Sequence, residues 1–136
     1  MRNPIAMLVL ALTAFIPAGA QDIYSSNGAR IATIDQYGTV RGSNGTKIGS
    51  FETDGTVRAA NGVKLGKIEQ DGRVRGSNGS TLGTISDDGT VRAANGSRIG
   101  KVESNGTIRG SNGTIVGRFR NVRMQRVAAF WFFFFR

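Results

Sequence analysis

Residues 46–62 read T-K-I-G-S-F-E-T-D-G-T-V-R-A-A-N-G, and residues 63–79 read V-K-L-G-K-I-E-Q-D-G-R-V-R-G-S-N-G. The same 17-residue pattern fills 29–45, 80–96 and 97–113, which gives five full units, and a partial sixth covers 114–120. Every full unit ends in Asn-Gly and carries a second turn signal, typically Asp-Gly, seven residues earlier. A fixed period of this kind is the signature of a repeat architecture.

Each unit has three apolar positions, occupied mainly by β-branched residues. The first position holds Ile31, Ile48, Leu65, Leu82, Ile99 and Val116. The second holds Ile34, Phe51, Ile68, Ile85, Val102 and Phe119, and the third holds Val40, Val57, Val74, Val91 and Ile108. Turn signals follow one another every seven to ten residues, so the segments between them predict short antiparallel strands, about ten in all. The segments between turn signals are too short to form stable helices.

The turn type follows from the pairing of apolar residues across each turn. A three-residue loop at Thr53–Gly55, closed by a glycine bulge, places Phe51 opposite Val57. The same loop at Ala60–Gly62 places Val57 opposite Leu65. Apolar cross-strand pairs stabilise a sheet by roughly 0.2–1 kcal/mol each, which favours this loop over a two-residue one. Glycine then occupies the position with positive φ.

A β-bulge is predicted between the first and second apolar positions, because these are three residues apart and would otherwise face opposite sides of a strand. The residue after the first apolar position is Gly49, Gly66, Gly83, Gly100 or Gly117, with Ala32 in the first unit. A bulge at this position would bring all three apolar positions into one layer. Closure of the hairpins into a ring removes exposed strand edges and is favoured over an open solenoid.

The two ends of the chain differ from the repeats. Residues 1–20 combine Arg2, an apolar run and Ala18-Gly19-Ala20, which predicts a cleaved secretory signal peptide rather than a membrane anchor. Residues 21–120 then form the repeat domain, and 121–136 form a basic linker with an aromatic tail. Localisation is expected to be secreted, periplasmic or at the cell envelope.

The aromatic tail has to be covered, because an apolar segment of this size is an aggregation hazard in water. Its predicted contact residues are Phe130, Trp131, Phe132, Phe133, Phe134 and Phe135. One alternative is packing across or through the ring of the same chain. The other is insertion into a membrane, a partner or a second copy, with the neighbouring arginines as an interfacial anchor.

The D-G-T-V-R and I-G-x-I repeats, the signal peptide and the terminal V-A-A-F-W-F-F-F-F together resemble the five-fold β-flower proteins, a family of small secreted bacterial proteins. The resemblance covers nearly the whole mature chain and departs from the pattern at Ala32 and Tyr37. It implies an all-β fold of five hairpin repeats in a closed five-fold barrel or flower. It supplies no activity.

Composition argues against a conventional enzyme. The chain contains neither histidine nor cysteine, which removes thiol nucleophiles, histidine bases and the usual zinc ligands. The turn acids Asp54, Asp71 and Asp88 are explained by turn chemistry, since calcium needs six to eight oxygens in one place. We therefore expect no catalytic residue, no cofactor and no metal site.

A repeated arginine is the most regular charged feature. Closure of the hairpins would arrange the five arginines in a ring. That ring could bind phosphate, carboxylate or sulfate, or each arginine could simply pair with an acid of the same unit. The residues are Arg41, Arg58, Arg75, Arg92 and Arg109.

The sequence favours a secreted, non-enzymatic structural or binding module at the cell envelope. One alternative is a membrane-associated or self-assembling protein that uses its arginine-rich aromatic tail, and a second is a carbohydrate- or anion-binding module. The partner is left open among a membrane surface, an envelope protein, a glycan and a second copy bound through the tail. Nucleic acid is not expected.

Overall fold

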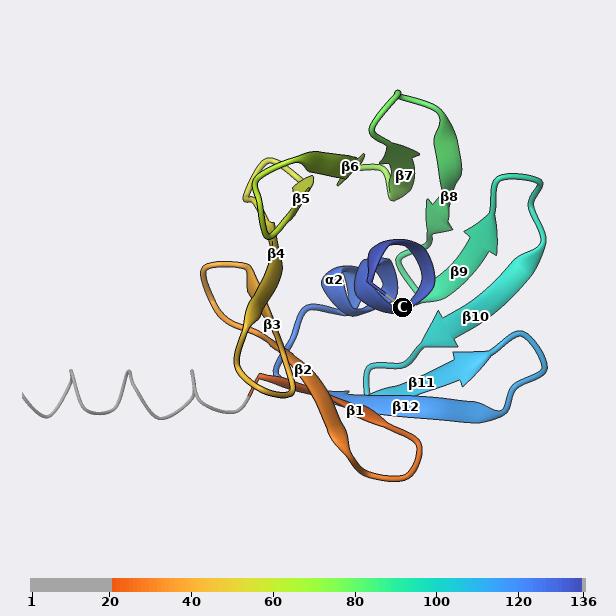
Figure 1. Ribbon diagram of the computed structural model, residues 1–136. Coiled ribbons are helices and arrows are strands. Elements are labelled where there is room, and N and C mark those ends of the chain that lie inside the picture. Colours follow the sequence, from red (N-terminus) through yellow and green to blue (C-terminus); the bar gives the residue numbers. More distant parts are fainter. Residues whose placement is uncertain (1–20, 136) are drawn as a thin grey trace, which may run out of the picture.

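Twelve antiparallel strands form a closed barrel in the computed structural model, which describes residues 21–135 (Figure 1). The predicted signal peptide at 1–20 lies outside the described residues. The strands are β1 (Asp22–Ser25), β2 (Arg30–Ile34), β3 (Thr39–Gly42), β4 (Lys47–Phe51), β5 (Thr56–Ala59), β6 (Lys64–Ile68), β7 (Arg73–Gly76), β8 (Thr81–Ile85), β9 (Thr90–Ala93), β10 (Arg98–Val102), β11 (Thr107–Gly110) and β12 (Ile115–Arg120). The tail continues as α2 (Met124–Ala129) and the π-helix η1 (Phe130–Phe134).

The predicted closure is confirmed, but the barrel has more strands than the expected ten. Residues 22–25 precede the first complete unit and form β1, which pairs with β2 on one side and with β12 on the other. Because β12 comes from the partial last unit, the two incomplete ends together supply a sixth pair of strands, which closes the ring and makes six hairpins in place of five. Counting complete sequence units misses this pair.

Two kinds of turn alternate around the barrel and define its two ends. The six Asn-Gly turns each close a hairpin at what we call the loop end. The five turns at Gly38, Gly55, Gly72, Gly89 and Gly106 connect successive hairpins at what we call the turn end. All eleven turn glycines have positive φ, as the three-residue loop requires.

Hydrogen bonds at both kinds of turn confirm the predicted loop. The Gly55 amide donates to the Glu52 carbonyl at 3.0 Å, and the Glu52 amide donates to the Thr56 carbonyl at 2.8 Å. Phe51 consequently lies opposite Val57, as predicted. The predicted pairing of Val57 with Leu65 is wrong, because Val57 lies opposite Gly66.

The cause of that shift is a bulge, which occurs in all six hairpins as predicted, although the extra residue is the first apolar position itself and not the residue after it. In the β5–β6 pair, Val57 faces Gly66 and Arg58 faces Lys64, so Leu65 is the extra residue. The bulge does not bring the three apolar positions to equal depth. Residues at the third position are buried, whereas those at the first are only half-buried and pack against the margin of the core.

The turn end is also tied together between hairpins. The Phe51 amide donates to the Gly38 carbonyl at 2.7 Å, and the equivalent bond recurs at each later turn. In the first hairpin the Gln21 carbonyl accepts from Ile34 instead, at 3.2 Å. Gln21 therefore takes the place of a turn glycine where the repeat has no preceding unit.

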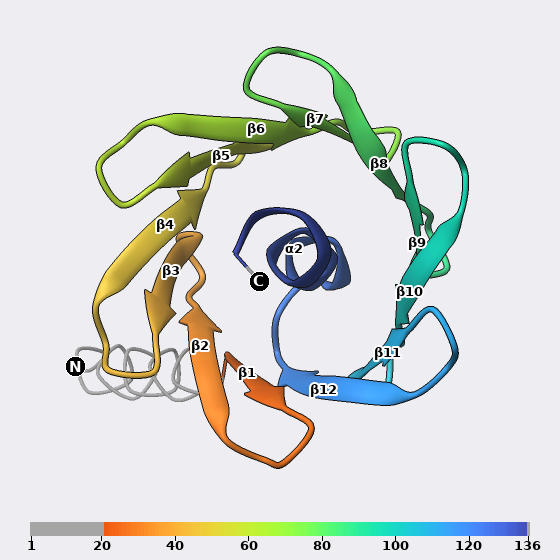
Figure 2. The same ribbon diagram turned by 45° about the vertical axis from the view of Figure 1, so that its right-hand side comes forward.

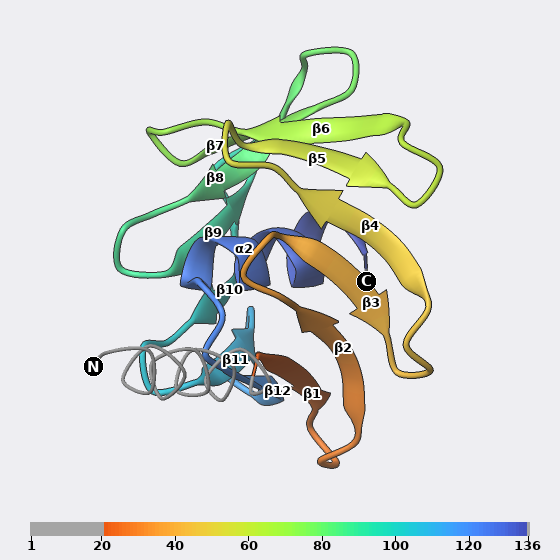
Figure 3. The same ribbon diagram turned by 90° about the vertical axis from the view of Figure 1, so that its left-hand side faces the viewer.

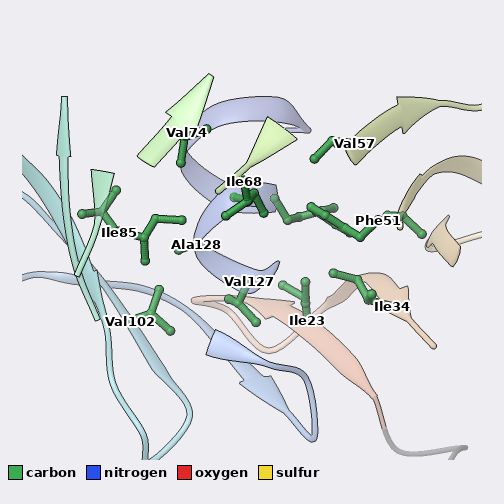
Figure 4. Close-up of a cluster of buried hydrophobic side chains, with 14 of the residues drawn as sticks. Ile23, Ile34, Phe51, Val57, Ile68, Val74, Ile85, Val102, Val127 and Ala128 are labelled. Atoms are coloured by element: carbon green, nitrogen blue, oxygen red, sulfur yellow. The ribbon is translucent and has the colours of Figure 1, made fainter. Parts of the chain in front are cut away.

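Helix α2 occupies the middle of the barrel and completes its core (Figures 2 and 4). Val127, Ala128 and Ala129 have no solvent exposure, and Phe130 is 2% exposed. The small alanine side chains allow the helix to pass among inward-facing residues such as Ile34, which is 1% exposed. The core is thus a barrel wall packed around an internal helix. Among residues 21–135, no helix has the length and apolar character needed to span a membrane.

Candidate functional site

The aromatic tail packs inside its own barrel, which answers the question that the sequence left open. Five successive side chains each rest on the glycine that follows the first apolar position of one hairpin. The pairs are Trp131 on Gly117, Phe132 on Gly100, Phe133 on Gly83, Phe134 on Gly66 and Phe135 on Gly49. One step along the tail corresponds to one 17-residue step back along the repeat.

These glycines are required by close approach rather than by unusual backbone angles. A methyl group on Gly83 would lie 2.7 Å from the Cζ atom of Phe133, and one on Gly117 would lie 2.7 Å from both Trp131 and the Tyr24 carbonyl oxygen. Carbon atoms in contact prefer separations of about 3.5–4.0 Å. Each glycine is therefore a seat for one aromatic ring.

The π-helix explains how five consecutive side chains can each contact a different hairpin. In an α-helix, residues four apart share a face, so Trp131 and Phe135 would compete for one direction. In η1 the Phe135 amide instead donates to the Phe130 carbonyl at 3.0 Å, and the two rings stack with centroids 5.6 Å apart. The wider turn gives residues 131–135 five separate directions.

The rings of Trp131 to Phe135 are half-buried, and we call this group the aromatic cluster. The last described part of the tail, η1, lies toward the side to which the β3–β4 and β5–β6 loops extend (Figure 3). The cluster therefore faces the loop end, while α2 occupies the barrel behind it.

A second set of half-buried residues continues this apolar surface outward, and we call it the aliphatic ring. It consists of Ile31, Ile48, Leu65, Leu82, Ile99 and Val116. Each of the last five precedes a seat glycine by one residue, on the loop side of it. A methyl group on Gly76 would lie 3.4 Å from Leu82, which shows that Leu82 lies along the inner face of its hairpin.

Charge is divided between the two ends of the barrel. The loop-end segments 23–32, 41–49, 58–66, 75–83, 92–100 and 109–117 contain nine lysines and arginines and no acid. All nine acids of the chain lie outside these segments, most of them at or beside the turns of the turn end. The loop end therefore combines an apolar inner surface with a basic outer surface.

The five predicted ring arginines each stabilise their own hairpin. Every one donates from Nη1 to the carbonyl of its Asn-Gly turn, at 2.9–3.1 Å. Arg58, Arg75 and Arg109 also pair with Glu52, Glu69 and Glu103 at 3.0–3.1 Å. Because their neighbours in sequence, such as Val57, point inward, the arginines point outward and do not converge on one point. A common anion site at these five residues stays a prediction.

A model of the 5-fold beta-flower proteins matches residues 20–136. The chain belongs to this family. Comparison with curated proteins and with solved structures gives no match. The closed ring of repeated hairpins agrees with the family's description, and in this β-flower the tail forms the centre of the flower.

The turn end of the flower carries a different, polar surface. A cleft of about 170 Å³ lies between the start of α2 and the turns around Asp54 and Glu69, with Arg123 and Arg126 on its helical side. Burial lowers the pKa of the Arg126 guanidinium, the charge of Arg123 lowers it further, and Asp35 opposes both effects. Opposite charges line this cleft together, so it favours no single ligand charge. In the described part of the flower, no three acids gather as metal ligands.

The sequence pattern identified the aromatic residues of the tail but not their positions. The same pattern predicts bulges at the partner glycines, and the equal number of these glycines and of aromatic residues at 131–135 is the signal that links the two sets. The pattern places the first apolar position in the same buried layer as the other two, so it does not predict that the aliphatic ring stays half-exposed.

Proposed function

We propose that this β-flower is a secreted, non-enzymatic structural or binding module of the cell envelope, and that the loop end is its binding surface. The supporting observation is the aromatic cluster, whose rings are fixed by their seat glycines yet remain half-exposed at an end without acids. Large apolar surfaces that stay accessible in a folded protein are characteristic of interaction sites.

The non-enzymatic character is supported by residue types. The absence of histidine and cysteine leaves aspartate, glutamate, lysine and hydroxyl groups for any chemistry. The pKa values of Asp54 and Asp88 are lowered by hydrogen bonds from Thr56 and Thr90, which stabilise the turns. Lowered carboxylate pKa values of this origin suit structural turns rather than proton transfer.

The alternative in which the free tail enters a membrane or joins a second copy is less favoured. Val127 to Phe130 are buried in the barrel, so tail release would open the core. A binding role for the fixed surface needs no such rearrangement. We therefore assign recognition to the assembled loop end and not to a released tail.

Two measurements test the proposal. Cell fractionation and mass spectrometry of the full chain should find a product beginning at Gln21 outside the cytoplasm. The purified mature chain should bind isolated envelopes, and the loop-end variant Leu65→Gln/Leu82→Gln should bind less while thermal unfolding still shows a cooperatively folded protein, since both leucines are only half-buried at the margin of the core. A cytoplasmic, unprocessed product would contradict secretion, and equal binding by both proteins would contradict the loop end as the binding surface.

A further inference from the structure

The loop end presents one continuous apolar surface with two levels. The aromatic cluster forms the inner level, and the aliphatic ring forms the outer level one residue nearer the loops. Both levels are half-buried, so the surface is accessible without any movement of the chain. Such a surface suits the alkyl or ring portion of a ligand, because burial of apolar area is favourable by about 25 cal/mol per Å².

Positive charge surrounds this surface and is only partly neutralised. Arg58, Arg75 and Arg109 have glutamate partners, and Arg30 lies 3.7 Å from Asp22. The five other basic side chains of the loop-end segments have no carboxylate within ion-pair distance among residues 21–135. They are Arg41, Lys47, Lys64, Arg92 and Arg98.

These five charges lie on the outer faces of the hairpins. Lys47 pairs across the sheet with Arg41, and Arg98 pairs with Arg92, so like charges stand beside one another. Adjacent like charges destabilise a sheet slightly, and an anion near them relieves that repulsion. Over the Debye length of about 8 Å at physiological salt, their field extends around the hairpin edges to the loop end.

We propose that the loop end binds a single anionic amphiphile, a molecule with an apolar chain and a phosphate or carboxylate headgroup. The chain lies against the aromatic cluster and the aliphatic ring, and the headgroup is attracted by the unpaired lysines and arginines. This inference rests on the proposed function and adds the class of ligand. Most residues at the hairpin tips are Ser, Thr, Asn or Gly, and Val63 is the one large apolar residue exposed there in the described chain, so the tips offer little apolar area to a membrane and favour one molecule over insertion into a bilayer.

The binding experiment uses dodecyl phosphate below its micelle concentration, with the mature chain at low salt. Trp131 is the sole tryptophan, and it belongs to the aromatic cluster, so its fluorescence reports directly on occupancy. We expect a saturable change in Trp131 emission with dodecyl phosphate. Inorganic phosphate and the neutral dodecyl maltoside should bind at least about tenfold more weakly, because each lacks one of the two interactions.

Two variants separate the contributions of chain and headgroup. Lys47→Gln/Lys64→Gln/Arg98→Gln removes three unpaired charges at the loop end and should weaken binding about tenfold, an effect that added salt should abolish. The matched control Lys67→Gln/Arg73→Gln/Lys101→Gln removes the same charge from the turn-end half of the strands and should bind as the parent does. Leu65→Gln/Leu82→Gln should weaken binding by about tenfold or more while thermal unfolding shows the fold retained.

Three results would overturn the proposal. They are equal binding of dodecyl phosphate and dodecyl maltoside, equal loss in the two charge variants, and binding to phosphatidylglycerol vesicles without binding to soluble dodecyl phosphate. The last result would assign the surface to a membrane instead. If the protein does not bind dodecyl phosphate but still binds envelopes, the proposed function holds and the ligand belongs to another class. If the chain is cytoplasmic, the proposed function is wrong whatever the result with dodecyl phosphate.

Discussion

The ring of Phe132 rests directly on Gly100, and the two residues leave no room between them for a methyl group. The carbonyl oxygen of Arg109, on the neighbouring strand, lies only 2.6 Å from where that methyl would be. Gly100 is thus held between the tail and the sheet. The same arrangement at the other four seat glycines makes the tail and the barrel one packing unit.

Gly100→Ala should lower the free energy of unfolding by about 1–3 kcal/mol, the usual cost of overpacking a core. Combining it with Phe132→Ala should cost less than the sum of the two single changes, because the second removes part of the clash created by the first. Urea denaturation of the two single variants and the double variant measures this coupling.

Gly110→Ala is the matched control for that substitution. A methyl at Gly110 would meet Val116 at 3.5 Å, an ordinary contact, and alternate units already carry alanine at this position, as at Ala59 and Ala93. We expect a change of less than about 0.5 kcal/mol. Equal destabilisation by Gly100→Ala and Gly110→Ala would show that the aromatic seats have no special role.

Truncation after Arg126 should prevent stable folding. It removes the buried Val127, Ala128, Ala129 and Phe130 together with the five half-buried rings at 131–135, and a fully buried large side chain such as Val127 or Phe130 contributes about 1.5–3 kcal/mol. That loss, together with the empty space left behind, approaches the entire stability of a small domain, about 5–15 kcal/mol. Circular dichroism and thermal unfolding of the truncated chain provide the measurement.

A synthetic peptide covering 121–136 should restore structure to the truncated chain, since the tail contacts the barrel through side chains that a separate peptide can also supply. A peptide in which alanine replaces residues 131–135 is the control and should restore less. If the truncated barrel melts at the parent's temperature without any peptide, the tail is not part of the core.

The contrast between the two classes of turn glycine gives another prediction. Gly72 and Gly79 flank β7 with nearly equal φ angles of +94° and +88°. Alanine at Gly79 would meet no atom within 4 Å and should cost only the backbone strain of roughly 1–3 kcal/mol. Alanine at Gly72 would also collide with the Ile85 carbonyl, so Gly72→Ala should be clearly the more destabilising in thermal unfolding. Equal effects would exclude a packing role for the turn end.

The local features that were predicted correctly depend on neighbours in sequence. Asp54-Gly55 and the apolar pair Phe51 and Val57 were enough to specify the three-residue loop, because turn geometry and cross-strand pairing agree there. The predicted pairing of Val57 with Leu65 is wrong because Leu65 is itself the extra residue of a bulge, which shifts the register of that pair by one residue.

The features that were not predicted depend on contacts distant in sequence. Residues 22–25 belong to the second half of a unit, with Ile23 placed 17 residues before Val40, so a count of complete units omits them; their pairing with β12 exists only once the ring has closed. Likewise, nothing local requires a π-helix at 130–134. Its wide turn arises because five seat glycines around the barrel each accept one aromatic ring, a constraint that exists only once the ring has closed.

Acid should weaken the fold through its turn-end carboxylates. Hydrogen bonds from the backbone and side chain of Thr56 lower the pKa of Asp54 below its usual 3.8, and Thr90 acts in the same way on Asp88. A group whose pKa is depressed on folding adds stability above its unfolded pKa, and this stability is lost as the pH falls through the folded value. Stability should therefore be constant above about pH 5 and should fall below pH 3.8.

The variant Asp54→Asn/Asp88→Asn should flatten that decline. Asparagine keeps an oxygen acceptor at the turn, as Asn105 does naturally toward the Thr107 amide at 3.1 Å, but it does not titrate. Urea unfolding of parent and variant between pH 2.5 and 6 is the test, and identical profiles would place the acid sensitivity in other carboxylates.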